Sequence, residues 1–258
     1  MRIAFGSMSH SGRLTLAAGI AGSGLLGLVA GDFVGRWEPI PASLPLHRPL
    51  AWLSGLVLIA CGVGLVRRPT MRVSALALGL FLLIWVVALH GPLVIAAPAD
   101  VRAWLYLGEV LAIACGALML WAAPSHGRVV MAARLGYAFS LLTFGASHFD
   151  NSRLIASVVP TYVPAPMAVA GITGAAHIAA GIALLLNLLP RLAAMLEAAM
   201  MSVFVLLVNV PEVLSSPTHI GPWTALLAEG ALVGAAWIVA AALRASAGAR
   251  VRSLFSLG

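Results

Sequence analysis

Long apolar stretches, separated by short polar loops, run through almost the whole chain. The longest stretch without Asp, Glu, Lys or Arg extends over residues 154–190, and others cover 14–31, 49–66 and 73–99. Each is close to or longer than the roughly 18 apolar residues that a helix needs to cross a bilayer. The pattern therefore predicts an all-α, polytopic membrane protein.

Glycine, proline and charged residues divide these stretches into eight segments. The predicted transmembrane helices cover about 14–35, 49–67, 72–94, 102–123, 129–148, 165–189, 191–214 and 222–243. The first segment follows a basic start, which is also how a secretory signal begins. We expect this segment to be retained as a helix, because it has a counterpart later in the chain.

The composition points to the same class of protein. Of the 258 residues, 62% are hydrophobic and only 9% are charged, whereas about a quarter of the residues in a soluble domain are charged. The net charge is +7, but the basic residues are all arginines and form no long run. We therefore expect the lipid bilayer as partner and no nucleic acid.

The arginines also predict an orientation. Eleven of the fifteen lie in segments on the same side as the N-terminus, and the other side holds Arg36, Arg48, Arg102 and Arg153. Cytoplasmic loops of membrane proteins carry an excess of basic residues. We therefore expect a multi-pass protein of the bacterial inner (plasma) membrane with both termini in the cytoplasm.

The chain contains an internal repeat. Residues 40–104 align without a gap on residues 159–223, at an offset of 119, and 15 of the 65 pairs are identical. The identical pairs include four prolines, two glycines, an arginine and a tryptophan, which biased apolar composition would not readily match in register. We predict two parallel four-helix repeats, over residues 14–123 and 129–243, because an even number of spans gives both copies the same orientation.

Polar side chains inside the spans are few, and they are the first candidates for function because burying them in a membrane is costly. The candidate ligand-binding residues are Asp32, His90 and Glu109 in the first unit and His148, His177, Asn209 and Glu229 in the second. All except His177 stand in three pairs of matched positions toward the outer side. Glu197 is predicted to lie toward the cytoplasmic half.

Each candidate has a structural and a functional interpretation. Glu109 and Glu229 either face a polar pocket, where they exchange protons or hold a ligand, or hydrogen-bond a neighbouring helix in the protonated form. Small neighbours, Gly108 and Gly230, predict that another backbone approaches closely there. His177 is either a core hydrogen-bonding partner or the most buried member of a site.

The remaining candidates have similar alternatives. His90 and Asn209 precede prolines and can satisfy the backbone groups that these prolines leave free. His148, which lies with Asp150 at the end of a span, either anchors the helix at the interface or ligates a metal, and the position favours anchoring. The chain has no HxxxH, HExxH or CxxC motif, so we expect no metal site and no resident cofactor, with a quinone as the remaining option.

Four motifs in the second half occur in the order found in the DoxX-like membrane protein family, which this half resembles. They are FGASHF (144–149), VPTYVPAP (159–166), TGAAHIAAGIALLL (173–186) and VNVP (208–211). Family members are typically single four-helix units, so the chain resembles a fused pair. Where the family often has a Glu in the second span, this chain has His177 in one copy and Leu58 in the other.

The resemblance implies a membrane fold more firmly than an activity. The family includes subunits tied to quinone-linked sulfur oxidation and components of membrane redox complexes, which implies a membrane or redox protein partner. The first hypothesis is a non-catalytic subunit or scaffold of a membrane complex. The second is a redox accessory that docks a quinone near His177, Asn209 and Glu229, and the third is a small-solute carrier. The sequence does not identify an enzymatic activity.

Overall fold

The computed structural model describes residues 3–123 and 125–255. In this part of the chain all regular structure is helical, and eight helices are long and apolar enough to cross a membrane. The predicted class, an all-α membrane protein, is confirmed. The spans comprise α1 (Ile3–Ala30), α2 (His47–Val66), α3 (Met71–Trp85) continued by η2 (Val86–His90) and α4 (Gly91–Ala96), α5 (Val101–Ala122), α6 (Gly127–Asp150), α8 (Pro166–Leu185), α9 (Pro190–Phe204) continued by η3 (Val205–Asn209) and α10 (Val210–Ser215), and α11 (Ile220–Phe255).

The first helix differs most from its predicted bounds. It begins at Ile3 and ends at Ala30, whereas the apolar pattern predicted residues 14–35. Gly31 follows with φ +63°, a left-handed conformation that glycine adopts at low cost and that commonly ends a helix. The apolar residues after it belong to a loop with a short 3-10 turn, η1 (Gly35–Trp37).

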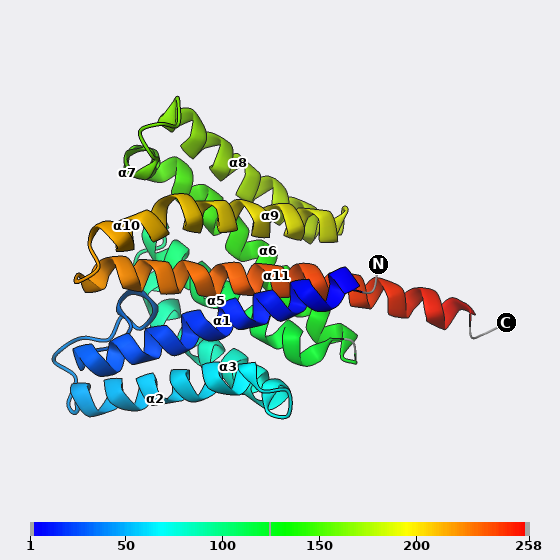
Figure 1. Ribbon diagram of the computed structural model, residues 1–258, viewed down its shortest axis with the longest axis horizontal. Coiled ribbons are helices and arrows are strands. Elements are labelled where there is room, and N and C mark those ends of the chain that lie inside the picture. Colours follow the sequence, from blue (N-terminus) through cyan, green and yellow to red (C-terminus); the bar gives the residue numbers. More distant parts are fainter. Residues whose placement is uncertain (1–2, 124, 256–258) are drawn as a thin grey trace.

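Two helices, α5 and α11, pack against each other at the centre of the bundle. α1 packs along α11 and α2, and α6 packs along α5 and α8. Figure 1 shows α1 and α11 running side by side. Their close approach depends on glycine, since a Cβ on Gly19 would lie 2.6 Å from the Leu227 carbonyl oxygen.

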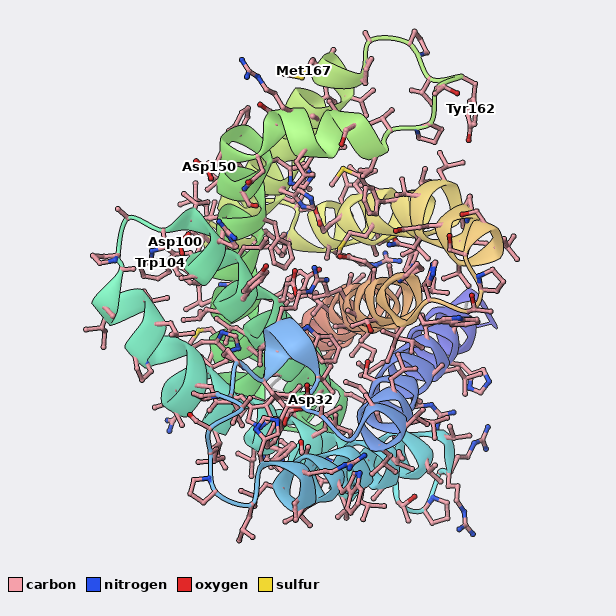
Figure 2. The ribbon with its side chains drawn as sticks, turned by 90° about the vertical axis from the view of Figure 1, so that its left-hand side faces the viewer. Asp32, Asp100, Trp104, Asp150, Tyr162 and Met167 are labelled. Carbon is pink, nitrogen blue, oxygen red and sulfur yellow. The ribbon has the colours of Figure 1, made fainter. Side chains whose placement is uncertain are left out.

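The start of α1 and the end of α11 lie at the same end of the bundle (Figure 1). We call the opposite end, which faces the viewer in Figure 2, the distal end. It carries Asp32, Asp100, Asp150 and Tyr162, and η1 lies near its middle. The second connection at this end holds a short helix, α7 (Ser152–Val158).

Several elements recur at the offset of 119 residues. α2 and α8 begin and end at equivalent positions, and so do the two π-helices, η2 and η3. The left-handed residues before α2 and α8, Leu46 and Ala165, are also equivalent. The duplication itself stays a prediction, and these bounds support it. Each π-helix ends at a candidate residue, His90 or Asn209.

Candidate functional site

One arginine at the distal end contacts both glutamates that were predicted as a pair. Arg36 Nε lies 2.9 Å from Glu109 Oε2 on α5, and Arg36 Nη2 lies 3.2 Å from Glu229 Oε1 on α11. The Glu109 side chain is 4% exposed and the Glu229 side chain is 22% exposed. The partner of both carboxylates is therefore a guanidinium, which neither interpretation of the sequence included. Two carboxyl groups therefore share one guanidinium in this cluster.

The glycines beside these glutamates differ in their surroundings. A Cβ on Gly108 would collide with the Thr143 side chain of α6. Gly108 therefore does allow a close approach, but of a side chain and not of a backbone. A Cβ on Gly230 would meet no heavy atom of the described residues within 4 Å. The predicted close approach of a backbone is therefore wrong at both glycines.

The residues that follow Arg36 anchor the first connection inside the bundle. Trp37 is 1% exposed, and its carbonyl accepts a hydrogen bond from His90 Nε2 at 2.9 Å. The Glu38 carboxylate is also buried and accepts hydrogen bonds from Ser54 Oγ at 2.5 Å and from the Val34 backbone N–H at 3.1 Å. Burial raises the pKa of Glu38 above its ordinary value, and the two hydrogen bonds oppose this shift.

Asp32 lies apart from this cluster, on the surface of the distal end. Its carboxylate accepts hydrogen bonds from His47 Nε2 at 2.8 Å and from the Phe33 backbone N–H at 2.7 Å. These two bonds, that from His47 first, hold the pKa of Asp32 below its ordinary value. The structure therefore gives Asp32 a role in ordering the connection between α1 and α2.

A second polar cluster lies inside the second half. His177 Nδ1 on α8 is 2.8 Å from Glu197 Oε1 on α9, and both side chains are buried. The His148 ring on α6 lies against the His177 ring, with centroids 4.8 Å apart, while its Nδ1 donates to the Phe144 carbonyl at 3.0 Å. His177 is thus both a hydrogen-bonding partner in the core and part of a larger cluster.

Several buried polar atoms in the second half have no hydrogen-bond partner among the described residues. They are Glu197 Oε2, the Tyr137 hydroxyl, Asn209 Oδ1, Arg134 Nε and Arg191 Nε. The first half also has such atoms, among them Ser23 Oγ, Trp37 Nε1 and His90 Nδ1. Leaving such a group unpaired costs about 1–3 kcal/mol, so each calls for an explanation such as a bound molecule. In the equivalent places of the first half, His90 contacts the Trp37 carbonyl, and Leu58 and Leu78 replace His177 and Glu197.

The structure divides the predicted residues into separate groups. Glu109 and Glu229 meet at Arg36, His148 meets His177, His90 contacts η1, and Asp32 contacts His47. No hydrogen bond or ion pair of the described residues joins Glu229 to His177 or Asn209. The three residues expected around one quinone are therefore not joined by direct contacts.

Sequence reasoning missed three participants in these clusters. Arg36 was counted only as a loop charge that sets orientation, and Glu38 and Tyr137 were not singled out. One local signal was available for Arg36 and Glu38, because they are the only charged residues in the apolar segment from 33 to 47. Their inward placement depends on the long-range contacts to α5 and α11 and therefore has no local signature.

The clusters do not form a site of the kind that holds a metal ion. No group of three His, Cys, Asp or Glu side chains in the described chain could ligate one. Both cysteines, Cys61 and Cys115, are free and buried.

Comparison with known proteins agrees with the fold. The family model named DoxX matches residues 129–210, which extend from α6 to the start of α10 and include His148, His177, Glu197 and Asn209. Neither the curated proteins nor the solved structures gave a match. Residues 129–210, in the second half of the chain, are therefore similar to the DoxX family.

Proposed function

We propose that this protein is a non-catalytic subunit or scaffold of a membrane complex. The observation that carries the proposal is the contact of Arg36 with both Glu109 and Glu229. This contact joins the two halves at the distal end through one buried and two partly buried charged groups. Such a fixed arrangement suits a platform for another protein better than a carrier, whose repeats must move against each other.

The distal connections offer a surface for a membrane or redox protein partner. Tyr162 is 72% exposed and Leu154 is 66% exposed, and both lie outside the helices that could cross the membrane. The prolines around Tyr162, in VPTYVPAP, limit the backbone freedom that would be lost on binding. Exposed aromatic side chains on a stiff loop are typical of interface anchors.

Co-purification tests this function. The tagged protein is isolated from its native membranes in mild detergent, and we expect a specific partner at a constant ratio. Tyr162→Ala together with Leu154→Ser should lose this partner while the protein stays at normal abundance. Ile172→Ala, on the exposed surface of α8, is the matched control and should keep it. A wild-type protein that elutes without a constant partner would contradict the proposal.

A second candidate is a quinone-interacting redox accessory. The observation that favours it is the buried His177–Glu197 pair, which the first half replaces with Leu58 and Leu78. A carboxylate beside an imidazole can accept and pass on a proton. We assign this role to Glu197, because Glu229 is already paired with Arg36. Glu197→Gln should abolish quinone-dependent activity of membranes at unchanged abundance, and unchanged activity would exclude this candidate.

We also propose that the protein resides in a bacterial inner membrane with both termini in the cytoplasm. The excess of arginine at the terminal end of the bundle supports this orientation. A fluorescent protein fused to the C-terminus should fold and fluoresce, whereas alkaline phosphatase fused after Tyr162 should be active. The reverse pattern would overturn the orientation.

A further inference from the structure

The two halves differ in what fills the distal interior of each four-helix unit. In the first half the connection folds inward: Trp37 is 1% exposed, and its carbonyl accepts a hydrogen bond from His90. Glu38, next in sequence, accepts a hydrogen bond from Ser54 on α2. The connection therefore occupies the distal interior of the first unit, where Trp37 Nε1 and His90 Nδ1 still have no hydrogen-bond partner among the described residues.

The second connection does not fold inward in this way. None of the residues of α7 is buried. At the position equivalent to Ser54, Thr173 donates its hydroxyl hydrogen bond within its own helix, to the Val169 carbonyl at 2.9 Å. At the position equivalent to His90, Asn209 is 4% exposed, and its Oδ1 has no partner among the described residues.

Open space lies beside α11 in the second half. A Cβ built on Gly230 would meet no heavy atom of the described chain within 4 Å. When Glu229 is aligned with Glu109, the residue equivalent to Gly230 is Val110, which is fully buried. The first unit thus fills a position that the second unit leaves open.

Asn209 and Gly230 lie at similar depth on facing helices. Trp237 Nε1 on α11 donates to Ser202 Oγ on α9 at 3.1 Å, which fixes how these two helices face each other. Gly230 precedes Trp237 by seven residues, about two helical turns, and so shares its face. Asn209 follows Ser202 by the same number and is the buried residue of η3, which packs against α11.

We propose that the open space beside Gly230 on α11, together with Asn209 of the adjoining η3, binds a small aromatic molecule that carries an O–H or ring N–H group. The buried Asn209 Oδ1 needs a hydrogen-bond donor, which defines the polar group of the ligand. Glu229 precedes Gly230 on α11, and its carboxylate, 22% exposed, is a further acceptor on this helix.

The first half indicates the shape of the ligand. There the indole of Trp37 belongs to the hydrophobic core at the distal end, so a flat ring fits this architecture. The missing side chain at Gly230 provides further room for such a ring. Phenol and indole have the required ring and donor, and toluene has the ring without the donor. This inference is independent of the proposed scaffold function.

Binding of these probes to the full-length protein in lipid nanodiscs tests the inference. Calorimetric titration should show saturable binding of indole and phenol, and toluene should bind at least tenfold more weakly. Gly230→Leu should reduce indole affinity at least tenfold because its side chain occupies the open space. Asn209→Leu should reduce it similarly, and its thermal midpoint should not fall, because the amide oxygen that it removes has no partner.

A glycine on the same helix provides the matched control. A Cβ on Gly221 of α11 also meets no heavy atom of the described chain within 4 Å, but Gly221 lies at the distal tip of the helix. Gly221→Leu should therefore leave indole affinity unchanged. The inference is overturned if indole and phenol do not bind saturably, if Gly230→Leu binds like wild type, or if toluene binds as tightly as indole.

Discussion

Arg36 joins the two halves through charge, and the balance of charge around it decides the effect of replacing it. The guanidinium faces two carboxylates, one from α5 and one from α11. Removing one partner of a buried ion pair is more harmful than removing both, because the remaining charge stays desolvated. Replacing Arg36 alone should therefore destabilise the protein more than replacing Arg36 together with both of its carboxylate partners.

Replacing Arg36 with Met should lower the stability of the protein by about 2–4 kcal/mol, since it leaves Glu109 and Glu229 facing each other without a cation. Thermal unfolding in a mild detergent measures this loss. The triple variant Arg36→Met, Glu109→Gln, Glu229→Gln should recover most of it. A single variant as stable as the wild type would show that the Arg36 contacts contribute little.

Glu38 should make stability depend on pH in a direction opposite to that of most acids. Burial raises the pKa of Glu38 above its ordinary value of 4.5. At a pH between these two values, Glu38 is protonated in the folded state and ionised in the unfolded state. Stability should therefore fall as the pH rises from the ordinary value toward the raised pKa. Glu38→Gln should remove this fall and be at least as stable as wild type at pH 7.

Asp32 provides the opposite control for that experiment. Its pKa is lowered by the hydrogen bond from His47, so its contribution is present above an ordinary pKa of 3.8 and is lost as the pH falls. Asp32→Asn should reduce the acid sensitivity of unfolding below about pH 4. If both variants changed the profile in the same direction, the assignment for Glu38 would be wrong.

At the scale of elements, the hydropathy pattern located all eight spans, because the length of a membrane-crossing helix is set by the bilayer. It failed at the first helix, where apolar residues continue past Gly31 into a loop that the bundle buries. Hydropathy reports burial and does not distinguish a helix from an inserted loop. The π-helices were not predicted, although proline at 92 and 211 marked the region.

The candidate site was predictable in its residues and not in its contacts. Equivalent positions and polarity singled out Glu109 and Glu229, and both lie in one partly buried charged cluster. The sequence could not indicate that Arg36 joins them, because this contact spans 193 residues to Glu229 and depends on how α11 packs on α5. The pairing of His177 with Glu197 was missed because the two were assigned to different depths.

That pairing yields a prediction about two helices together. His177→Leu should lower stability by about 3–5 kcal/mol, because it leaves Glu197, which is 2% exposed, without its partner. The double variant His177→Leu, Glu197→Leu should lose less than His177→Leu alone, since the first half packs Leu58 and Leu78 fully buried at these positions. A double-mutant cycle with unfolding in detergent measures the coupling, and additive losses would contradict the prediction.

At the scale of the whole molecule, the two halves interlock instead of standing as separate bundles. The first helix of each half packs against the last helix of the other: α1 lies on α11, and α6 lies on α5. α5 and α11 also pack on each other at the centre. The short segment between α5 and α6 therefore adds little to an association that the helices already secure.

Cutting that segment should leave the halves together. We expect a protease site inserted after Ser125, with flexible residues on either side, to allow cleavage into two fragments that co-elute in mild detergent. Their thermal midpoint should fall by only a few degrees, because a covalent link chiefly reduces the entropy of the separated state. The variant Arg36→Met removes the polar contact between the halves. In the cleaved form of this variant, the fragments should separate at a temperature lower than the one at which the uncleaved variant unfolds. Fragments that part on cleavage alone would show that each half packs mainly within itself, and the interlocked arrangement of α1 with α11 would be wrong.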